Sequence, residues 1–326
     1  MPWGSSAGKA AVKVSFNRPY GASTNGAAAY GMGAGEFLTN LQPVAQGYPI
    51  SSAGWDHNLV RWLEKEGYDV TYITNIDAHA HPHTLQGHRV FLSSGHDEYW
   101  SWQMRSHVQK ALENGTNLVF LGANAIYWQV RFESSPTNGE LNRIMVIYKN
   151  READPLSGVD YLATVRWREP PVSRPEDTLI GVGYVLDPVD GDIVVTNASH
   201  WVFAHTGLQD GSILPGLLGY EVDGLLGHQP STTEILAASP ASSFAYRWGD
   251  DPESDPADNA VSNMVVHTAS SGAQVFATGT IQWSWGLDDY NVPNLRSSRR
   301  NPAAEEITRN VLRRFGASNS NEEGRH

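Results

Sequence analysis

Short apolar runs alternate with segments of helical periodicity through the first half of the chain. Apolar and β-branched residues cluster in runs that predict strands at residues 12–16, 69–74, 88–93 and 117–121. Between these runs, apolar residues recur at helical spacing in residues 59–66 and 102–113. Alternating strands and helices are typical of an α/β fold, in which helices flank an open, mostly parallel sheet.

The pattern changes from about residue 131 to residue 240. Short β-like runs are separated there by turns rich in proline and glycine, which indicates a β-rich insertion packed on the sheet. Residues 274–278 then predict one more core strand. Residues 303–315 predict an amphipathic helix, with Ile307, Val311, Leu312 and Phe315 on its apolar side.

These elements together predict a single α/β domain over residues 1–326. Its core is expected at about 12–130 and 270–316, and the polar tail at 317–326 is expected to fray. A homo-oligomer is compatible with this organisation.

Composition narrows the classes of function. The net charge of −12, without a basic stripe, argues against nucleic acid as a partner. No apolar run approaches the roughly 18 residues of a membrane span, and we expect no nucleotide cofactor. The chain has no cysteine, which excludes disulfides, thiolate metal ligands and a cysteine nucleophile.

The compartment is not fixed by the sequence. Residues 1–4 lack the basic and then apolar pattern of a signal peptide. An extracellular location would therefore require that such a peptide had been removed.

Three segments follow predicted strands, where ligands bind in open α/β sheets. These segments are residues 95–100, 122–128 and 280–285. We expect Tyr99, Asn124 and Gln282 to lie at the same rim of the sheet.

The first of these segments contains an imidazole, two carboxylates and a phenol in consecutive positions, His96, Asp97, Glu98 and Tyr99. Such groups serve as general acids or bases and as ligands for hard metals. The alternative is an N-terminal cap for the helix at residues 102–113, where acidic residues favour the helix dipole. A cap explains one acidic residue well and the whole quartet poorly. We assign proton transfer to His96 and Glu98 and substrate binding to Asp97.

Other candidates are weaker when taken singly. Asn124, Tyr127, Trp128, Gln282 and Trp283 have the amide and aromatic groups of a substrate pocket, but a turn asparagine followed by core aromatics has the same pattern.

Glu221 is a second acid/base candidate. Its alternative interpretation is a solvated strand end.

As a set, these motifs resemble the C-terminal domain family of the N,N-dimethylformamidase large (beta) subunit. Residues 95–99 are similar to its His-x-Glu-Tyr motif, and residues 122–128 to its Gly-Gly-Asn-Gly-x-Tyr-Trp motif. Residues 62–70 and 74–79, residues 219–223 and 279–283, and the terminal helix also fit, so that the resemblance covers roughly residues 12–316.

The resemblance implies a glutamine-amidotransferase-like α/β fold and one iron ion held by two tyrosines and a glutamate. Tyr99 matches one ligand tyrosine. The second should precede the helix that contains Trp62, where this chain has Trp55-Asp56-His57-Asn58, so His57 or Asp56 would have to replace it. The ligand glutamate has three candidates: Glu133, Glu169 and Glu221. Zinc is the alternative metal.

We therefore expect a metal-assisted hydrolase that acts on a C–N bond of the amide type in a small molecule. The first alternative is a carbohydrate-active or glycan-binding domain with a tryptophan-lined cleft, in which Asp97 and Glu98 are the acids. The second is a non-catalytic relative.

Overall fold

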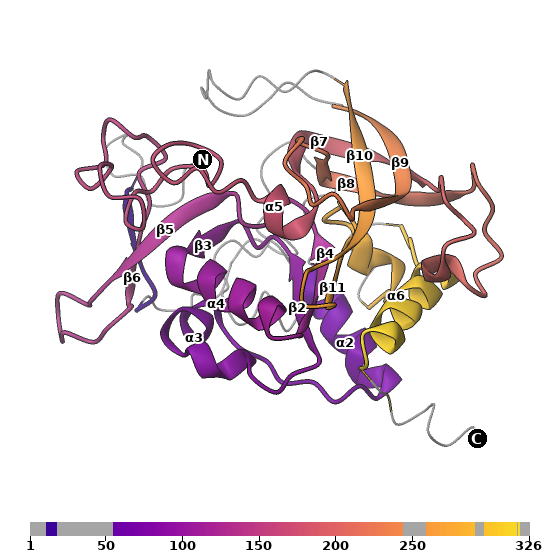
Figure 1. Cartoon of the computed structure of the whole chain (residues 1–326), viewed down its shortest axis with the longest axis horizontal. Helices are drawn as coiled ribbons and strands as arrows, with labels where there is room; N and C mark the ends of the chain where they lie inside the picture. Colours follow the sequence, from indigo (N-terminus) through magenta and orange to yellow (C-terminus); the bar gives the residue numbers. More distant parts are fainter. Residues whose placement is uncertain (1–10, 18–54, 244–258, 291–296, 318, 320–326) are drawn as a thin grey trace.

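The main sheet of the protein has five strands, of which three are parallel. The computed structural model describes residues 11–17, 55–243, 259–290, 297–317 and 319 (Figure 1). The sheet has the order β2-β4-β11-β10-β9. Its strands are β2 (Val90–Gly95), β4 (Asn117–Gly122), β11 (Gln274–Ala277), β10 (Asn259–Thr268) and β9 (Glu234–Ser242). β2, β4 and β11 are parallel, and β10 and β9 continue the sheet antiparallel.

Two smaller sheets complete the β structure. One has the order β1-β6-β5-β3, and the other is the ribbon β7-β8. Their strands are β1 (Lys13–Ser15), β6 (Ile144–Val146), β5 (Trp128–Glu133), β3 (Tyr99–Ser101), β7 (Gly183–Val194) and β8 (Ile213–Gly224). Of these pairs only β3 and β5 are parallel.

The helices lie on both sides of the β2–β4 pair. α3 and α4 lie on one side in Figure 1, and α2 and α6 lie on the other. The helices are α2 (Asp56–Glu66), α3 (Asn75–Ala80), α4 (Trp102–Glu113), α5 (Asp177–Ile180) and α6 (Pro302–Arg314), with short 3₁₀ turns η2 (Pro82–Leu85), η3 (Trp201–Phe203) and η4 (Trp283–Gly286). Ser101 caps α4 by accepting a hydrogen bond from the backbone N–H of Met104.

The expected α/β fold, an open and mostly parallel sheet of the glutamine-amidotransferase type, is wrong. In the part of the chain that the structure describes, β-sheet with mixed, antiparallel-rich pairing predominates and the helices are few. The predicted strand at 12–16 pairs with β6 in a different sheet, and residues 69–74 form no strand. Apolar periodicity identifies residues that favour extended backbone, but partners distant in the chain decide which strands pair.

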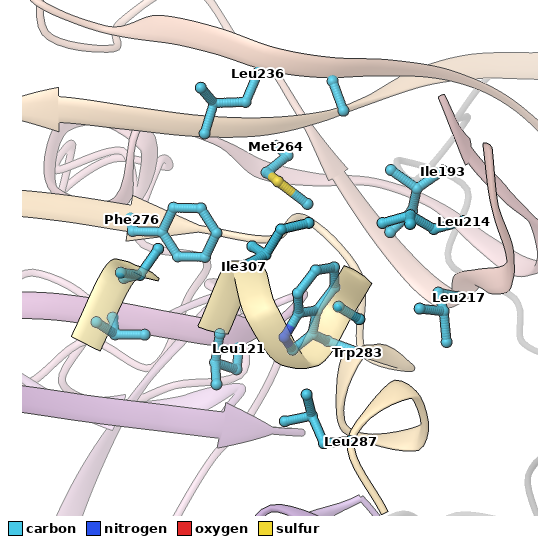
Figure 2. Close-up of a cluster of buried hydrophobic side chains, with 14 of the residues drawn as sticks. Leu121, Ile193, Leu214, Leu217, Leu236, Met264, Phe276, Trp283, Leu287 and Ile307 are labelled. Atoms are coloured by element: carbon cyan, nitrogen blue, oxygen red, sulfur yellow. The ribbon is translucent and has the colours of Figure 1, made fainter. Parts of the chain in front are cut away.

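Two buried clusters occupy the two faces of the main sheet. β4 alternates between them, because Val119 and Leu121 join one cluster and Leu118 and Phe120 join the other. Figure 2 shows part of the first cluster, where Ile307 of α6 lies beside Phe276 and Trp283. The predicted terminal helix is confirmed, since Ile307, Val311, Leu312 and Phe315 are all buried.

The predicted division of the chain into a core and an insertion stays a prediction. Residues 131–240 do contain β6, β7, β8 and most of β9. Of the tail at 317–326, only residues 317 and 319 are described.

Candidate functional site

An imidazole lies between two carboxylates at the carboxyl end of β2. The chain turns at Gly95, which has a φ of 62°, and places His96 beside the sheet. His96 Nε2 lies 2.9 Å from Glu98 Oε2, and His96 Nδ1 lies 3.2 Å from Glu221 Oε2 on β8. The side chains of Glu98 and Glu221 are 9% and 8% exposed, whereas that of His96 is 38% exposed. The imidazole is therefore the accessible member of this cluster.

The charges of the cluster favour a protonated His96. Burial lowers its pKa, but Glu221 and Glu98 outweigh burial and hold the pKa well above its ordinary value. Burial alone would raise the pKa of Glu98. The hydrogen bond and charge of His96, followed by the charge of Lys149, lower it by more than burial raises it, so the net shift is downward. The result is an imidazolium held by an ionised Glu98.

The phenol of Tyr99 extends the cluster. Lys149 Nζ donates to the Tyr99 hydroxyl at 3.0 Å, and the ammonium lies 5.1 Å from the ring centroids of both Tyr99 and Trp128. Burial, then the charge and hydrogen bond of Glu98, then Glu221, raise the pKa of Tyr99. Tyr99 is therefore a neutral phenol that contacts both a cation and a carboxylate.

Residues 122–128 dock against the same segment, as predicted. The backbone N–H groups of Tyr127 and Trp128 donate to the Glu98 carbonyl at 3.0 Å. Asn124 has a φ of 54°, and its N–H donates to Asp223 Oδ1 at 2.7 Å. The side chains of Asn124, Tyr127 and Trp128 are all buried. The structure thus brings these three residues to the cluster, and their roles in substrate binding stay predictions.

Asp223 is a residue of this region that the sequence analysis missed. Burial raises its pKa to about 8; the hydrogen bond from the Asn124 N–H opposes the shift, and Glu176 and Glu221 add to it. A signal was present, because residues 221 and 223 lie two apart in a strand and therefore face the same side. No comparable signal pointed to Lys149.

Asp56, rather than His57, lies beside the cluster. A Cβ on Gly95 would lie 2.7 Å from Asp56 Oδ1. Burial and then the charge of Asp97 raise the pKa of Asp56 to about 6. His57 packs its ring edge-on against Tyr290, with centroids 5.0 Å apart. The structure therefore directs His57, one expected metal ligand, toward Tyr290.

The third predicted segment, residues 280–285, is buried and contacts β8, the strand that contains Glu221. Gln282 is fully buried and donates from Nε2 to the carbonyls of Gly216 and Leu218 on β8. Trp283 is also fully buried, and its Nε1–H donates to Thr308 Oγ1 at 3.1 Å. Gln282 therefore holds the strand that contains Glu221, and Trp283 belongs to the core. The structure does not place either side chain at an open pocket.

A cavity of about 780 Å³ adjoins the cluster. Asp56, His96 and Asp97 are among its lining residues. Asp97 accepts hydrogen bonds from Ser93 Oγ at 2.7 Å and from Asn75 Nδ2 at 3.2 Å. The accessible side of the imidazole thus faces a space large enough for a small molecule.

The donor atoms around Tyr99 suit a hard metal ion in their chemistry. Glu221 Oε2 is buried and lies 3.2 Å from His96 Nδ1, although the two groups are not aligned as a hydrogen bond. Tyr99 and Glu98 add further oxygen atoms. Among the described residues, no three histidine or carboxylate side chains are grouped as a metal site. A metal would therefore depend on the phenol as a ligand.

The chain belongs to the N,N-dimethylformamidase beta subunit-like, C-terminal family, which matches residues 3–297. The resemblance inferred from the motifs is thus confirmed. The N,N-dimethylformamidase beta subunit of Alcaligenes sp is 23% identical, and that of Paracoccus aminophilus is 24% identical. Each comparison covers 85% of this chain and 39% of the relative. The chain therefore spans about two fifths of the length of these curated relatives.

Both relatives are named as subunits. In the part of the chain that the structure describes, no helix has the length and apolar character to cross a membrane.

Proposed function

We propose that the cluster of His96, Glu98, Tyr99 and Glu221 hydrolyses the C–N bond of an amide. The observation that carries this proposal is the imidazole between two carboxylates, 2.9 Å and 3.2 Å away. Membership of a family named for an amide hydrolase supports it.

Each residue has a distinct chemical task in this proposal. His96 carries a proton that it can donate to the nitrogen of the leaving amine. Glu98 is ionised and can accept a proton from water as the water oxygen bonds to the amide carbon; after His96 has protonated the amine and the C–N bond has broken, Glu98 returns that proton to His96. The neutral hydroxyl of Tyr99, held by Lys149, lies next to these groups and can donate to the carbonyl oxygen of the amide.

Metal assistance is the finer part of the proposal, and with an ion bound Tyr99 and Glu98 would be its ligands in place of their roles as proton donor and proton acceptor. Tyr99, Glu98 and Glu221 are the residues that would hold an iron or zinc ion. A bound ion would supply Lewis-acid polarisation of the amide carbonyl. The buried oxygen of Glu221, which pairs with His96 without an aligned hydrogen bond, supports this assignment.

The glycan alternative has less support. Trp283 and Trp285 are fully buried, so neither offers an exposed ring on which a sugar can stack. The non-catalytic alternative is addressed by the same experiment as the proposal itself.

The test compares wild type with Tyr99→Phe, which removes one oxygen and keeps the ring. Tyr161→Phe is the matched control, because Tyr161 is exposed and does not line the cavity beside the cluster. Metal content, the absorption spectrum and release of amine from a panel of N-alkyl amides are measured on all three proteins. We expect Tyr99→Phe alone to lose metal, colour and amine release. A wild-type protein that binds neither iron nor zinc on reconstitution would end the metal proposal, and one that cleaves no amide would favour the non-catalytic alternative.

A further inference from the structure

The cavity beside the cluster follows the edge of a strand. Every residue from Val90 to Ser94 lines it, and so does every residue from 68 to 75. Successive residues of a strand point to opposite faces of a sheet. A cavity lined by consecutive residues therefore lies along the free edge of β2 and not above one face. We call this space the edge slot.

The edge slot is enclosed by both buried clusters. On one side it is lined by Leu59 and Leu63 of α2 and Leu312 of α6. On the other it is lined by residues of α3 and α4, namely Ala78, Met104 and Val108. These helices lie on opposite sides of β2 in Figure 1. A strand inside a sheet has the same surroundings, with an extended edge on each side and an apolar layer above and below. β2 has six residues, which gives the slot a length of roughly 20 Å.

Both edges of the slot carry unpaired backbone groups. β2 pairs with β4 on its other edge, where the Arg89 carbonyl accepts from the N–H of Asn117. Because parallel strands alternate the direction of their hydrogen-bonding groups, Val90, Leu92 and Ser94 direct theirs into the slot. Within the described chain, these groups and the backbone of residues 69–73 form no hydrogen bonds. Such edges are templates for another extended chain.

One end of the slot is acidic. Asp56 and Asp97 line it where β2 ends, beside His96. The charge of His96 acts on both aspartates, but His96 also lies between Glu98 and Glu221, so that one imidazolium faces four carboxyl groups. A ligand with a positive charge at this end would complement them.

We propose that the edge slot binds an extended peptide segment with apolar side chains and a basic residue at the end beside Asp56. A peptide supplies N–H and C=O groups to both unpaired edges, and its alternating side chains enter the two apolar walls. A purely aliphatic ligand would leave the backbone groups of Val90, Leu92 and Ser94 without partners. The inference rests on the proposed function in one respect: because His96 lines the slot, an amide of the bound segment would lie next to the hydrolytic cluster, which makes peptides the substrate class.

Binding is tested separately from cleavage. The probe is a fluorescein-labelled peptide of alternating valine and threonine with lysine at both ends, so that either strand direction places a cation near Asp56. Fluorescence polarisation measures its affinity for the full chain. Val70→Trp fills the slot, since Val70 lines it, and Val261→Trp is the matched control on the exposed surface of β10. A second probe is N-methylated at alternate amides and needs no change in the protein. The third is an alkylammonium of equal length.

We expect Val70→Trp and the N-methylated peptide each to weaken binding by about tenfold or more, because several main-chain hydrogen bonds are lost. Val261→Trp should bind as wild type does. Absence of binding, or equal affinity for the alkylammonium and the N-methylated peptide, would overturn the proposal. A peptide that binds in the predicted way but stays intact would support the slot and overturn the hydrolytic role of the cluster toward peptides.

Discussion

The core beneath α6 and the polar cluster at the end of β2 are built in opposite ways, although both lie on the same sheet. The core is formed by apolar side chains that recur along a helix, such as Ile307 and Phe315, and by strands that they cover. The cluster unites His96 with Glu221, which lies more than a hundred positions later in the chain. Non-directional packing tolerates small changes in the core, whereas the cluster depends on two distances near 3 Å.

The substitution His96→Gln in the polar cluster should have the largest effect of all, and this effect should be on activity. Loss of a proton carrier reduces amide hydrolysis by about 10²- to 10⁴-fold. The thermal midpoint should fall as well, because Glu98 and Glu221 are buried and lose the imidazolium between them, but the loss of activity per folded molecule should be the far larger effect. Steady-state kinetics and a melting curve on the same sample measure both. A variant that melts early and keeps its activity would reverse the comparison.

Phe315→Ala should show the opposite behaviour. Phe315 is 3% exposed and packs in the core cluster. Its truncation is expected to lower the free energy of unfolding by about 3–5 kcal/mol. Activity per folded molecule should be unchanged, since the residue has no contact with His96. Urea unfolding with parallel activity assays checks this, and an unchanged urea midpoint would show that the helix is peripheral.

Asp223 lies beside the polar cluster, yet its protonation should affect the stability of the whole fold. Burial raises its pKa from the ordinary 3.8 of an aspartate to about 8 in the folded protein, so the folded protein retains a proton that the unfolded chain releases. The stabilisation is complete below pH 4 and is lost toward pH 8, at up to about 1.4 kcal/mol per pH unit.

Asp223→Asn should therefore flatten the pH dependence. The uncharged amide also has an oxygen that can accept from the Asn124 N–H. Urea midpoints at pH 5, 6.5 and 8 measure the slope for both proteins. Equal slopes would show that Asp223 is ionised in the folded state.

Asn301→Ala should have the smallest effect and should affect only the core. Asn301 caps α6 by accepting from the N–H groups of Ala303 and Ala304. Loss of the cap costs about 1 kcal/mol. The urea midpoint should fall slightly while kcat and KM stay constant. A change in kinetics would mean that the end of α6 affects the geometry of the cluster.

Local patterns in the sequence were sufficient for some elements and insufficient for others. The helices at 59–66, 102–113 and 303–315 were predicted because periodicity and end signals, such as Gly67 after the first of them, act within a few residues. The sheet was predicted wrongly because the same apolar alternation suits several partners, and β1 pairs with β6 instead of the main sheet.

The same distinction applies to the site. His96, Glu98 and Tyr99 were found together because they are neighbours in the chain, and Glu221 was a separate candidate. Gln282 and Trp283 looked equally suitable, but their hydrogen bonds to β8 and Thr308 are visible only in three dimensions. Lys149 reaches Tyr99 from a turn with a φ of 55°, a position that its sequence neighbours do not indicate.

Two glycines form the junction of β2 and β4, and their contacts limit which residues can occupy these two positions. A Cβ on Gly122 would lie 2.5 Å from the Gly95 carbonyl oxygen, and one on Gly95 would meet Asp56. Neither position can therefore drift to another residue while the junction keeps its shape. Family members that keep this junction are therefore expected to have glycine at both positions, and a member with another residue at either position should have a different backbone after β2.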